Sequence, residues 1–281
     1  MVCWSRPSFG FNDQTMRNRD WKSRKPGKPH GARVGMRRPA HGERRDPDAP
    51  AILYGWHTVT LALTNPARRI RRLYATENAM RRLAEEGLKP AVAPELVRPD
   101  KIAARLGPDA VHQGLLAEVD PLPSPELEDI PDGILLVLDQ ITDPHNVGAI
   151  LRTAAGFAVS AIVTTARHSP EATGVLAKSA SGALEYVPIA IVPNLARALD
   201  ELKERGYLVV GLDSTGETDL GKVPLRSPLA LVLGAEGKGL RQLTRATCDH
   251  LARLDLPGKI KSLNVSNAAA LALYVATQRL A

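Results

Sequence analysis

Cysteine is almost absent from this chain of 281 residues, which contains only two. Cys3 and Cys248 stand far apart, and neither belongs to a CxxC pair. The sequence therefore argues against a disulfide framework and against a structural zinc site. Such sparing use of cysteine is typical of a protein that works in the reducing cytoplasm, which is the location we expect.

Long apolar runs and aromatic side chains are also scarce. No apolar run reaches the roughly 18–20 residues that span a bilayer, so we expect no membrane segment. The N-terminus lacks the apolar core of a secretory signal. Aromatic residues number 3 Trp, 5 Tyr and 3 Phe, and four of them (Trp4, Phe9, Phe11 and Trp21) precede residue 50. The core must therefore be packed mainly with Leu, Val, Ile and Ala.

Basic residues exceed acidic ones only at the N-terminus. The formal net charge is +7, and residues 1–50 account for all of it, with 12 Lys and Arg against 5 Asp and Glu. A neutral folded body with a basic arm is expected from this distribution. Because residues 1–50 show no helix or strand period, we expect the arm to be disordered when free. It can track RNA phosphates, but a solubilising tail, a mispredicted start codon and an organelle targeting segment stay open.

The rest of the chain divides into two folded parts. Residues 51–119 indicate a small α/β domain, and the proline-rich stretch 120–131 (DPLPSPELEDIP) indicates a linker. Residues 132–281 alternate apolar strands with helices, which predicts a parallel sheet covered on both faces. Ligands bind such sheets at the carboxyl ends of the strands. The predicted strands are 70–75, 111–119, 134–139, 161–165, 187–191, 208–212, 229–233 and 251–256, and the predicted helices are 56–63, 78–86, 146–156, 173–181, 195–205, 240–247 and 264–280.

Polar residues gather in three loops at these strand ends. In the first loop, Asn146 stands where a helix should begin, so it can be a plain N-cap. Arg152 follows six residues later among small residues, where it can bind a phosphate or carboxylate through two parallel hydrogen bonds. In the second loop, GAEGKG (234–239), Glu236 can cap a helix or bind a ribose hydroxyl.

The third loop holds four Ser and Asn residues within positions 262–267, which is more than one helix cap requires. Common catalytic motifs do not match these loops. The second loop is not a P-loop, because Gly239 follows Lys238, and it is not a dinucleotide fingerprint, because Gln242 replaces the third glycine. No Ser–His–Asp arrangement and no metal-ligand cluster emerges, so we expect no metal.

Taken together, NVGAILRTA (146–154), LVLGAEGKGL (231–240) and LDLPGKIKSLNVSNAAALALY (254–274) resemble the three motifs of the SpoU/TrmH family of RNA ribose 2′-O-methyltransferases, within the SPOUT superfamily. The segments Tyr54–His57, Arg69–Tyr74 and Val111–Gly114 are similar to the small L30e-like RNA-binding domain of some members. With Asp143–Asn146, they look most like the bacterial 23S rRNA guanosine 2′-O-methyltransferase branch.

The resemblance implies an α/β fold whose SPOUT-type parallel sheet ends in a C-terminal trefoil knot and follows the L30e-like domain and the disordered basic arm. It also implies a homodimer whose active sites combine residues of both chains, with S-adenosylmethionine as cofactor, RNA as substrate and no metal. The implied catalytic residues are Arg152, Asn146, Glu236, Asn264 and Ser266, and the implied cofactor-binding residues are Gly234, Leu254, Leu256, Ser262 and Leu263.

Two features of this interpretation stay open at the level of sequence. Arg152 is either an unusually placed base or a phosphate clamp, because a free guanidinium has a pKa above about 12. Ala158 occupies a position where the family usually has glycine, and a left-handed turn there would be strained. A tRNA ribose methyltransferase and a non-catalytic RNA-binding ribosome-assembly factor are the alternative functions.

Overall fold

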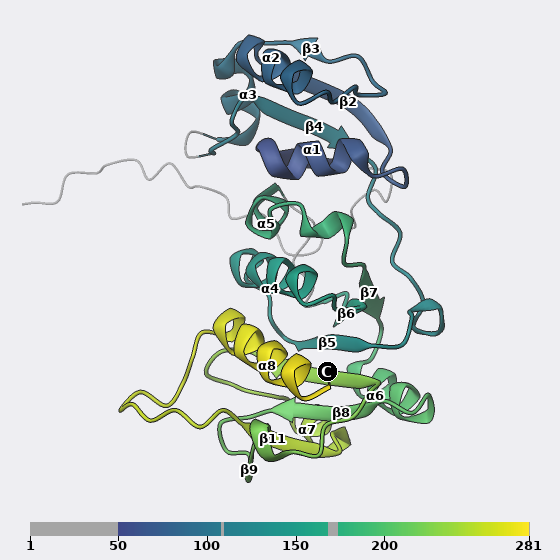
Figure 1. The fold of residues 1–281 in the computed structure, drawn as a ribbon, viewed down its shortest axis with the longest axis vertical. Coiled ribbons are helices and arrows are strands. Elements are labelled where there is room, and N and C mark those ends of the chain that lie inside the picture. The colour runs from purple at the N-terminus through teal and green to yellow at the C-terminus, as the bar shows by residue number, and fades with distance from the viewer. Residues whose placement is uncertain (1–49, 108–109, 168–173, 281) are drawn as a thin grey trace, which may run out of the picture. The chain divides into compact units, whose positions relative to one another are not determined.

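The computed structural model describes residues 50–107, 110–167 and 174–280. The basic arm expected over residues 1–50 lies outside the described residues, Pro50 apart. The strands of the described part form two sheets, which Figure 1 shows with their helices. Within this part, no helix is both long enough and apolar enough to cross a bilayer.

The first sheet has four strands in the order β1-β4-β2-β3. Successive residues of β2 face opposite sides, so Leu73 packs with α1 and α2, whereas Tyr74 packs with Ile102 of α3. The strands are β1 (Ala51–Tyr54), β2 (Ile70–Ala75), β3 (Glu95–Leu96) and β4 (Leu115–Val119), and the helices are α1 (Trp56–Thr64), α2 (Glu77–Glu85) and α3 (Pro99–Leu106).

The second sheet has seven strands in the order β7-β6-β5-β10-β8-β11-β9, and every pairing in it is parallel, as predicted. Its strands are β5 (Ile134–Asp139), β6 (Ala161–Thr165), β7 (Ile189–Val192), β8 (Leu208–Leu212), β9 (Thr218–Asp219), β10 (Leu229–Gly234) and β11 (His250–Arg253). Its helices are α4 (Pro144–Gly156), α5 (Gly174–Ala180), α6 (Leu195–Glu204), α7 (Gln242–Thr247) and α8 (Val265–Leu280), with 3-10 turns η1 (Leu127–Asp129), η2 (Ala183–Glu185) and η3 (Leu220–Lys222).

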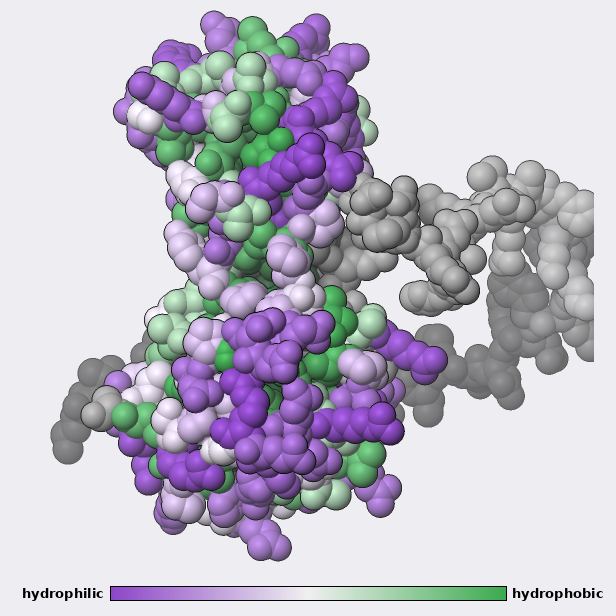
Figure 2. Space-filling model, turned by 90° about the vertical axis from the view of Figure 1, so that its right-hand side faces the viewer, coloured by the Kyte–Doolittle hydropathy of each residue, from purple (hydrophilic) through white to green (hydrophobic). Residues whose placement is uncertain are grey.

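Helices cover both faces of this sheet, which confirms the predicted layering. One core packs α4, α5 and α8 against Leu136 and Leu231, and the other packs α6 against Leu135 and Val232. These neighbouring strand residues point alternately to the two cores, which explains why the strands are apolar throughout. On the face shown in Figure 2, hydrophilic residues cover most of the lower part, and hydrophobic residues show between hydrophilic ones in the upper part.

Several predicted boundaries were wrong for local reasons. The strand expected at 111–119 begins only at Leu115, because Gln113 (φ +52°) and Gly114 (φ +82°) are left-handed and turn the chain. The strand expected at 251–256 ends at Arg253. The short strands β1, β3 and β9 and the helix α3 were not predicted.

Ala158 adopts the left-handed turn that the sequence had put in doubt. Ala158 has a φ of +52°, and it follows the end of α4, where Val159 N donates to Ala154 O at 3.0 Å. A non-glycine residue in this conformation costs about 1–2 kcal/mol. The turn is therefore held by the hydrogen bonds that end the helix and not by the preference of alanine.

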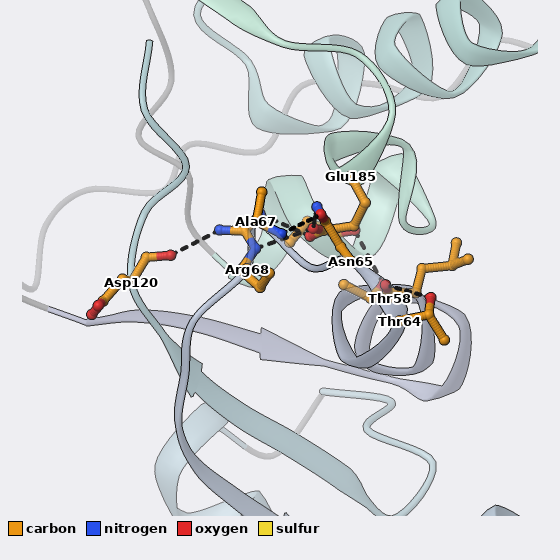
Figure 3. Close-up of polar contacts among 9 residues, drawn as sticks. Thr58, Thr64, Asn65, Ala67, Arg68, Asp120 and Glu185 are labelled. Atoms are coloured by element: carbon orange, nitrogen blue, oxygen red, sulfur yellow. Dashed lines mark hydrogen bonds and ion pairs between the residues drawn. The ribbon is translucent and has the colours of Figure 1, made fainter. Parts of the chain in front are cut away.

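A buried ion pair joins the two sheet-containing parts of the chain (Figure 3). The Arg68 guanidinium donates to both carboxylate oxygens of Glu185, from Nε at 3.1 Å and from Nη2 at 2.7 Å. Asn65 Nδ2 donates to the same carboxylate at 2.7 Å, and Arg68 Nη1 donates to the backbone oxygen of Asp120 at 2.9 Å. Both ionic side chains are at most 4% exposed. Buried charges need such complete hydrogen bonding, so the pair fixes the segments before β2, after β4 and before β7 against one another.

We expect Glu185→Gln to lower the free energy of unfolding by about 3–5 kcal/mol, because Arg68 would stay buried without its counter-charge. Urea denaturation followed by circular dichroism measures the loss. Glu86→Gln is the matched control, since it breaks the exposed Arg82–Glu86 pair and should cost about 0.5 kcal/mol or less. Equal stability of the two variants would contradict the role of the buried pair.

Candidate active site

The first loop begins its helix earlier than the sequence suggests. Pro144 occupies the first turn of α4, and the Asp143 side chain caps the helix by accepting from His145 N at 3.0 Å. Asn146 is therefore not the N-cap, one of the roles that the sequence left open. Because Asp143 does the capping, the Asn146 side chain is available for contacts with other loops.

Asn146, Glu236 and Asn264 come from three separate loops and meet in one hydrogen-bond network. Glu236 Oε1 accepts from Asn264 Nδ2 at 2.7 Å, from Val265 N at 3.1 Å and from Asn146 Nδ2 at 3.4 Å. Asn264 Nδ2 also donates to Asn146 Oδ1 at 2.9 Å. A single carboxylate oxygen thus ties the starts of α4 and α8 to the loop that follows β10.

Ser266 completes the network from the first turn of α8. Its backbone N and its Oγ both donate to Asn264 Oδ1, at 2.9 and 2.6 Å. The Asn264 amide therefore uses both donor hydrogens and accepts twice, which fixes its orientation. Asn264 serves as a helix cap and as part of the network, so the two roles that the sequence offered for this loop coexist.

Beside the network lies a cavity of about 380 Å³, a size suited to a small organic ligand. Gly234 must stay a glycine here, because a Cβ on it would lie 2.2 Å from the carbonyl carbon of Gly239. The loop folds back on itself through Gly239 N, which donates to Ala235 O at 2.8 Å. The lining includes all five residues predicted to bind the cofactor, namely Gly234, Leu254, Leu256, Ser262 and Leu263. Leu254 and Leu256 belong to the segment that follows the end of β11 at Arg253.

A second cavity of about 450 Å³ opens on the other side of Glu236. Its lining is mainly polar and includes Asn146, Asp143 and Lys238, and Ala235, Glu236 and Val265 line both cavities. Glu236 Oε2 makes no hydrogen bond with a described residue. The arrangement can therefore hold a ligand in one cavity and present a carboxylate acceptor to a polar group in the other.

Arg152 stands apart from this network in the same chain. It lies six residues after Asn146 on α4, which is about 9 Å along the helix and 240° around it. Its side chain is exposed and makes no hydrogen bond or ion pair with any described residue. The structure brings Asn146, Glu236, Asn264 and Ser266 together, and Arg152 does not join them.

A buried carboxylate that the sequence analysis missed supports the loop after β10. Asp139 ends β5 with no exposed surface, and it accepts from Arg241 N at 2.9 Å and from Arg241 Nε at 2.6 Å. This pair anchors the start of α7 to the carboxyl end of β5. The available signal was the single acid that ends the apolar run ILLVLD.

The described part of the chain offers little for metal binding or for catalysis by a thiol. No group of three or more His, Cys, Asp and Glu side chains there could hold a metal ion. Burial raises the pKa of Cys248 to about 12, so this thiol stays protonated at neutral pH and is a poor nucleophile.

Two family models match the chain, the SpoU rRNA Methylase family over residues 133–274 and an RNA 2′-O ribose methyltransferase substrate-binding family over residues 52–125. The chain is 40% identical over 238 residues to the 23S rRNA (guanosine-2′-O-)-methyltransferase RlmB of Ralstonia nicotianae, covering 81% of this chain and 95% of that protein. It is 38% identical to the protein of the same name from Pseudomonas putida, covering 81% and 96%.

Among solved structures, a putative TrmH-family RNA methyltransferase from Porphyromonas gingivalis aligns with a TM-score of 0.70 and 26% identity, over 82% of this chain and 90% of that one. The SpoU methyltransferase AviRb from Streptomyces viridochromogenes, solved in complex with AdoMet, also aligns with a TM-score of 0.70 over the same shares of the two chains. At 24% identity, this second likeness shows the fold alone.

We expect Glu236→Ala to speed hydrogen exchange of the Val265 amide by roughly 10–100-fold, because a hydrogen bond to a charged acceptor contributes about 1.5–3 kcal/mol. Exchange measured by NMR tests this directly. Glu201→Ala, an exposed change on α6, is the control and should leave Val265 exchange unchanged. Unchanged exchange in Glu236→Ala would mean that the carboxylate does not hold the start of α8.

Proposed function

The chain belongs to the SpoU rRNA methylase family, and from that membership we propose that it methylates the ribose 2′-hydroxyl of a guanosine in 23S rRNA, with S-adenosylmethionine as the methyl donor. The observation that carries this proposal is the meeting of three separate loops at Glu236, beside a cavity of cofactor size. Identity of 38–40% to 23S rRNA guanosine methyltransferases over nearly their whole length favours rRNA over tRNA.

The residues around the 380 Å³ cavity fit the cofactor. Its backbone-rich lining of Gly234, Leu254, Leu256, Ser262 and Leu263 would hold S-adenosylmethionine, and apolar leucines flank a few polar groups there. When bound, the cofactor supplies a methyl group already activated on a sulfonium. The protein must therefore exclude water, hold the ribose and assist loss of the 2′-hydroxyl proton.

We assign these tasks to the network and to Arg152. Glu236 Oε2 offers a ribose hydroxyl an acceptor at the boundary of the two cavities, and Asn146, Asn264 and Ser266 keep that carboxylate in place. Arg152 binds the phosphate beside the target hydroxyl and so aligns that hydroxyl. It does not act as a base, because a guanidinium keeps its proton at neutral pH. No metal is assigned a role.

We propose the following division of the chain. Residues 51–119 form the L30e-like RNA-binding domain, 120–131 the linker, 132–281 the methyltransferase domain, and 1–50 a basic arm. The substrate-binding family match at 52–125 supports the first assignment. A trefoil knot in the methyltransferase domain is supported by the segment after β11, which returns to the loop after β10 through Val265 N and Glu236. We place the protein in the cytoplasm.

We also propose that the active enzyme is a homodimer. Arg152 is exposed and lacks a partner among the described residues of its own chain, and α8 exposes Leu271 and Tyr274. A second copy packed on these helices would bury the apolar groups and bring one chain's Arg152 to the other chain's network.

Purified protein should add one 2′-O-methyl group to protein-free 23S rRNA in the presence of S-adenosylmethionine and EDTA. The Arg152→Ala variant should lower the rate of methylation at least about 100-fold, while its binding of the cofactor persists. Primer extension maps the nucleotide, and calorimetry measures cofactor binding. Parallel reactions with tRNA test the alternative substrate. Full activity of Arg152→Ala would contradict the assigned role, and an inactive wild-type protein that binds RNA would favour an assembly factor.

Coexpression of Arg152→Ala with Gly234→Ala should restore about a quarter of wild-type activity, although each variant alone is inactive. Half of the dimers are then mixed, and one of the two sites in each mixed dimer combines an intact cavity with the partner's intact Arg152. If Arg152 acts within its own chain, the mixture stays inactive. If the two variants carry different affinity tags, two successive affinity purifications, one for each tag, isolate the mixed dimer itself.

A further inference from the structure

Helix α5 lies between α1 of the small sheet and α4 of the larger sheet (Figure 1). Its Lys178 reaches the small sheet, where Nζ donates to Gln113 Oε1 at 3.2 Å. The same oxygen accepts from Trp56 N at 3.0 Å. Gly55 makes this approach possible, because a Cβ there would lie 2.5 Å from the ammonium nitrogen. Two segments noted in the sequence, Tyr54–His57 and Val111–Gly114, therefore meet at Lys178.

Among the described residues, Lys178 has no counter-charge. No carboxylate there pairs with it, and its one hydrogen bond to a described residue uses one of its three N–H donors. Partial burial lowers the pKa of Lys178 because the ammonium has lost water. Some other cations near the small sheet do pair with carboxylates, as Arg72 does with Glu95 and Arg105 with Glu118.

Gln113, which contacts Lys178, and its chain neighbour His112 both have donors to offer. Gln113 uses its oxygen for Lys178 and Trp56, which leaves its amide NH₂ to donate. His112 Nδ1 accepts from Gly114 N at 3.0 Å, so the neutral ring carries its hydrogen on Nε2. Burial lowers the pKa of His112, which favours the neutral ring. A cluster of donors with one unpaired cation suits an anion.

Helix α5 also connects Lys178 to the candidate active site. Ser179 follows Lys178 on α5, and its Oγ lies 3.3 Å from His145 Nδ1. His145 immediately precedes Asn146 of the network. Helix α5 can approach α4 this closely because Gly148 has no side chain, and a Cβ there would lie 2.3 Å from the Ser179 Cβ. Polar groups therefore continue from the small sheet, across α5, to the start of α4.

We propose that Lys178, with the amide of Gln113, binds a backbone phosphate of the RNA strand where it passes from the small sheet to the active site. This inference rests on the proposed function, since it takes RNA as the ligand. Lys178 is thereby a substrate-positioning residue, and it holds the strand in a register that brings the target ribose to Asn146 and Glu236. The ligand chemistry is a single phosphodiester, bound without reading a base.

The test measures the Kd of the full-length protein for a 23S rRNA transcript at several KCl concentrations between roughly 50 and 300 mM. Each phosphate contact contributes a slope of about 0.7–0.9 in log Kd against log salt. Lys178→Gln should lower the slope by about that amount and weaken binding about three- to tenfold near 150 mM salt. Lys178→Arg should keep the wild-type slope because it keeps the charge. Lys89→Gln, at an exposed lysine after α2, is the matched control and should change the slope less.

A second measurement needs no variant. Acetylation of Lys178 by an amine-reactive reagent, followed by mass spectrometry, should slow when rRNA is bound, whereas Lys89 in the same sample should react as before. An unchanged slope in Lys178→Gln, or unprotected Lys178 in the complex, overturns the inference even if the variant is less stable. If the wild-type protein neither binds nor methylates rRNA, the proposed function fails first, and that result is seen before any variant is compared.

Discussion

The candidate site depends on a single carboxylate oxygen. Glu236 Oε1 accepts from donors on Asn146 and Asn264, which are 90 and 28 residues away in the chain, and from the first backbone N–H of α8. The start of α4, the loop after β10 and the start of α8 are thereby held together, and both cavities lie against the oxygen that joins them. Asp139 holds the same loop from the other end through Arg241. A loop fixed at both ends keeps its shape without a bound ligand, so little conformational entropy is lost when one binds.

The larger sheet could be predicted from sequence because its strands carry a strong local signal. Runs such as ILLVLD and LALVLG are short and apolar at every position, which is typical of a strand buried on both faces. The short strands β3 and β9 contain two residues each, too few to show any period. The start of β4 was misjudged because Gln113 and Gly114 adopt left-handed conformations that apolar periodicity does not report. The start of α4 was misjudged because Asp143 and Pro144 were not recognised as its cap and first turn.

The residues of the site were predicted more fully than their contacts. Family motifs indicated Asn146, Glu236, Asn264 and Ser266 as parts of one site, but sequence alone could not tell which oxygen accepts from which donor. Pairs such as Arg68–Glu185 gave no signal, because the two residues are 117 positions apart and neither lies in an unusual local pattern. Burial turns that pair from an ordinary surface charge pair into a constraint on the orientation of the small sheet. That orientation decides which groups of the small sheet lie near α5.

Net charge is a poor guide to where this protein meets RNA. Residues 51–281 are neutral overall, yet affinity for a nucleic acid comes largely from cations that meet phosphates. What matters is which cations are left without a partner. The arginines around the small sheet mostly face carboxylates, and an ion pair must be broken or shared before such a group can bind phosphate. Lys178 and Arg152 have no such competitor among the described residues, and they lie on α5 and α4, which pack together. A strand that meets both Lys178 and an Arg152 is held more tightly than one that meets either cation alone, which makes position, and not net attraction, the basis of selectivity.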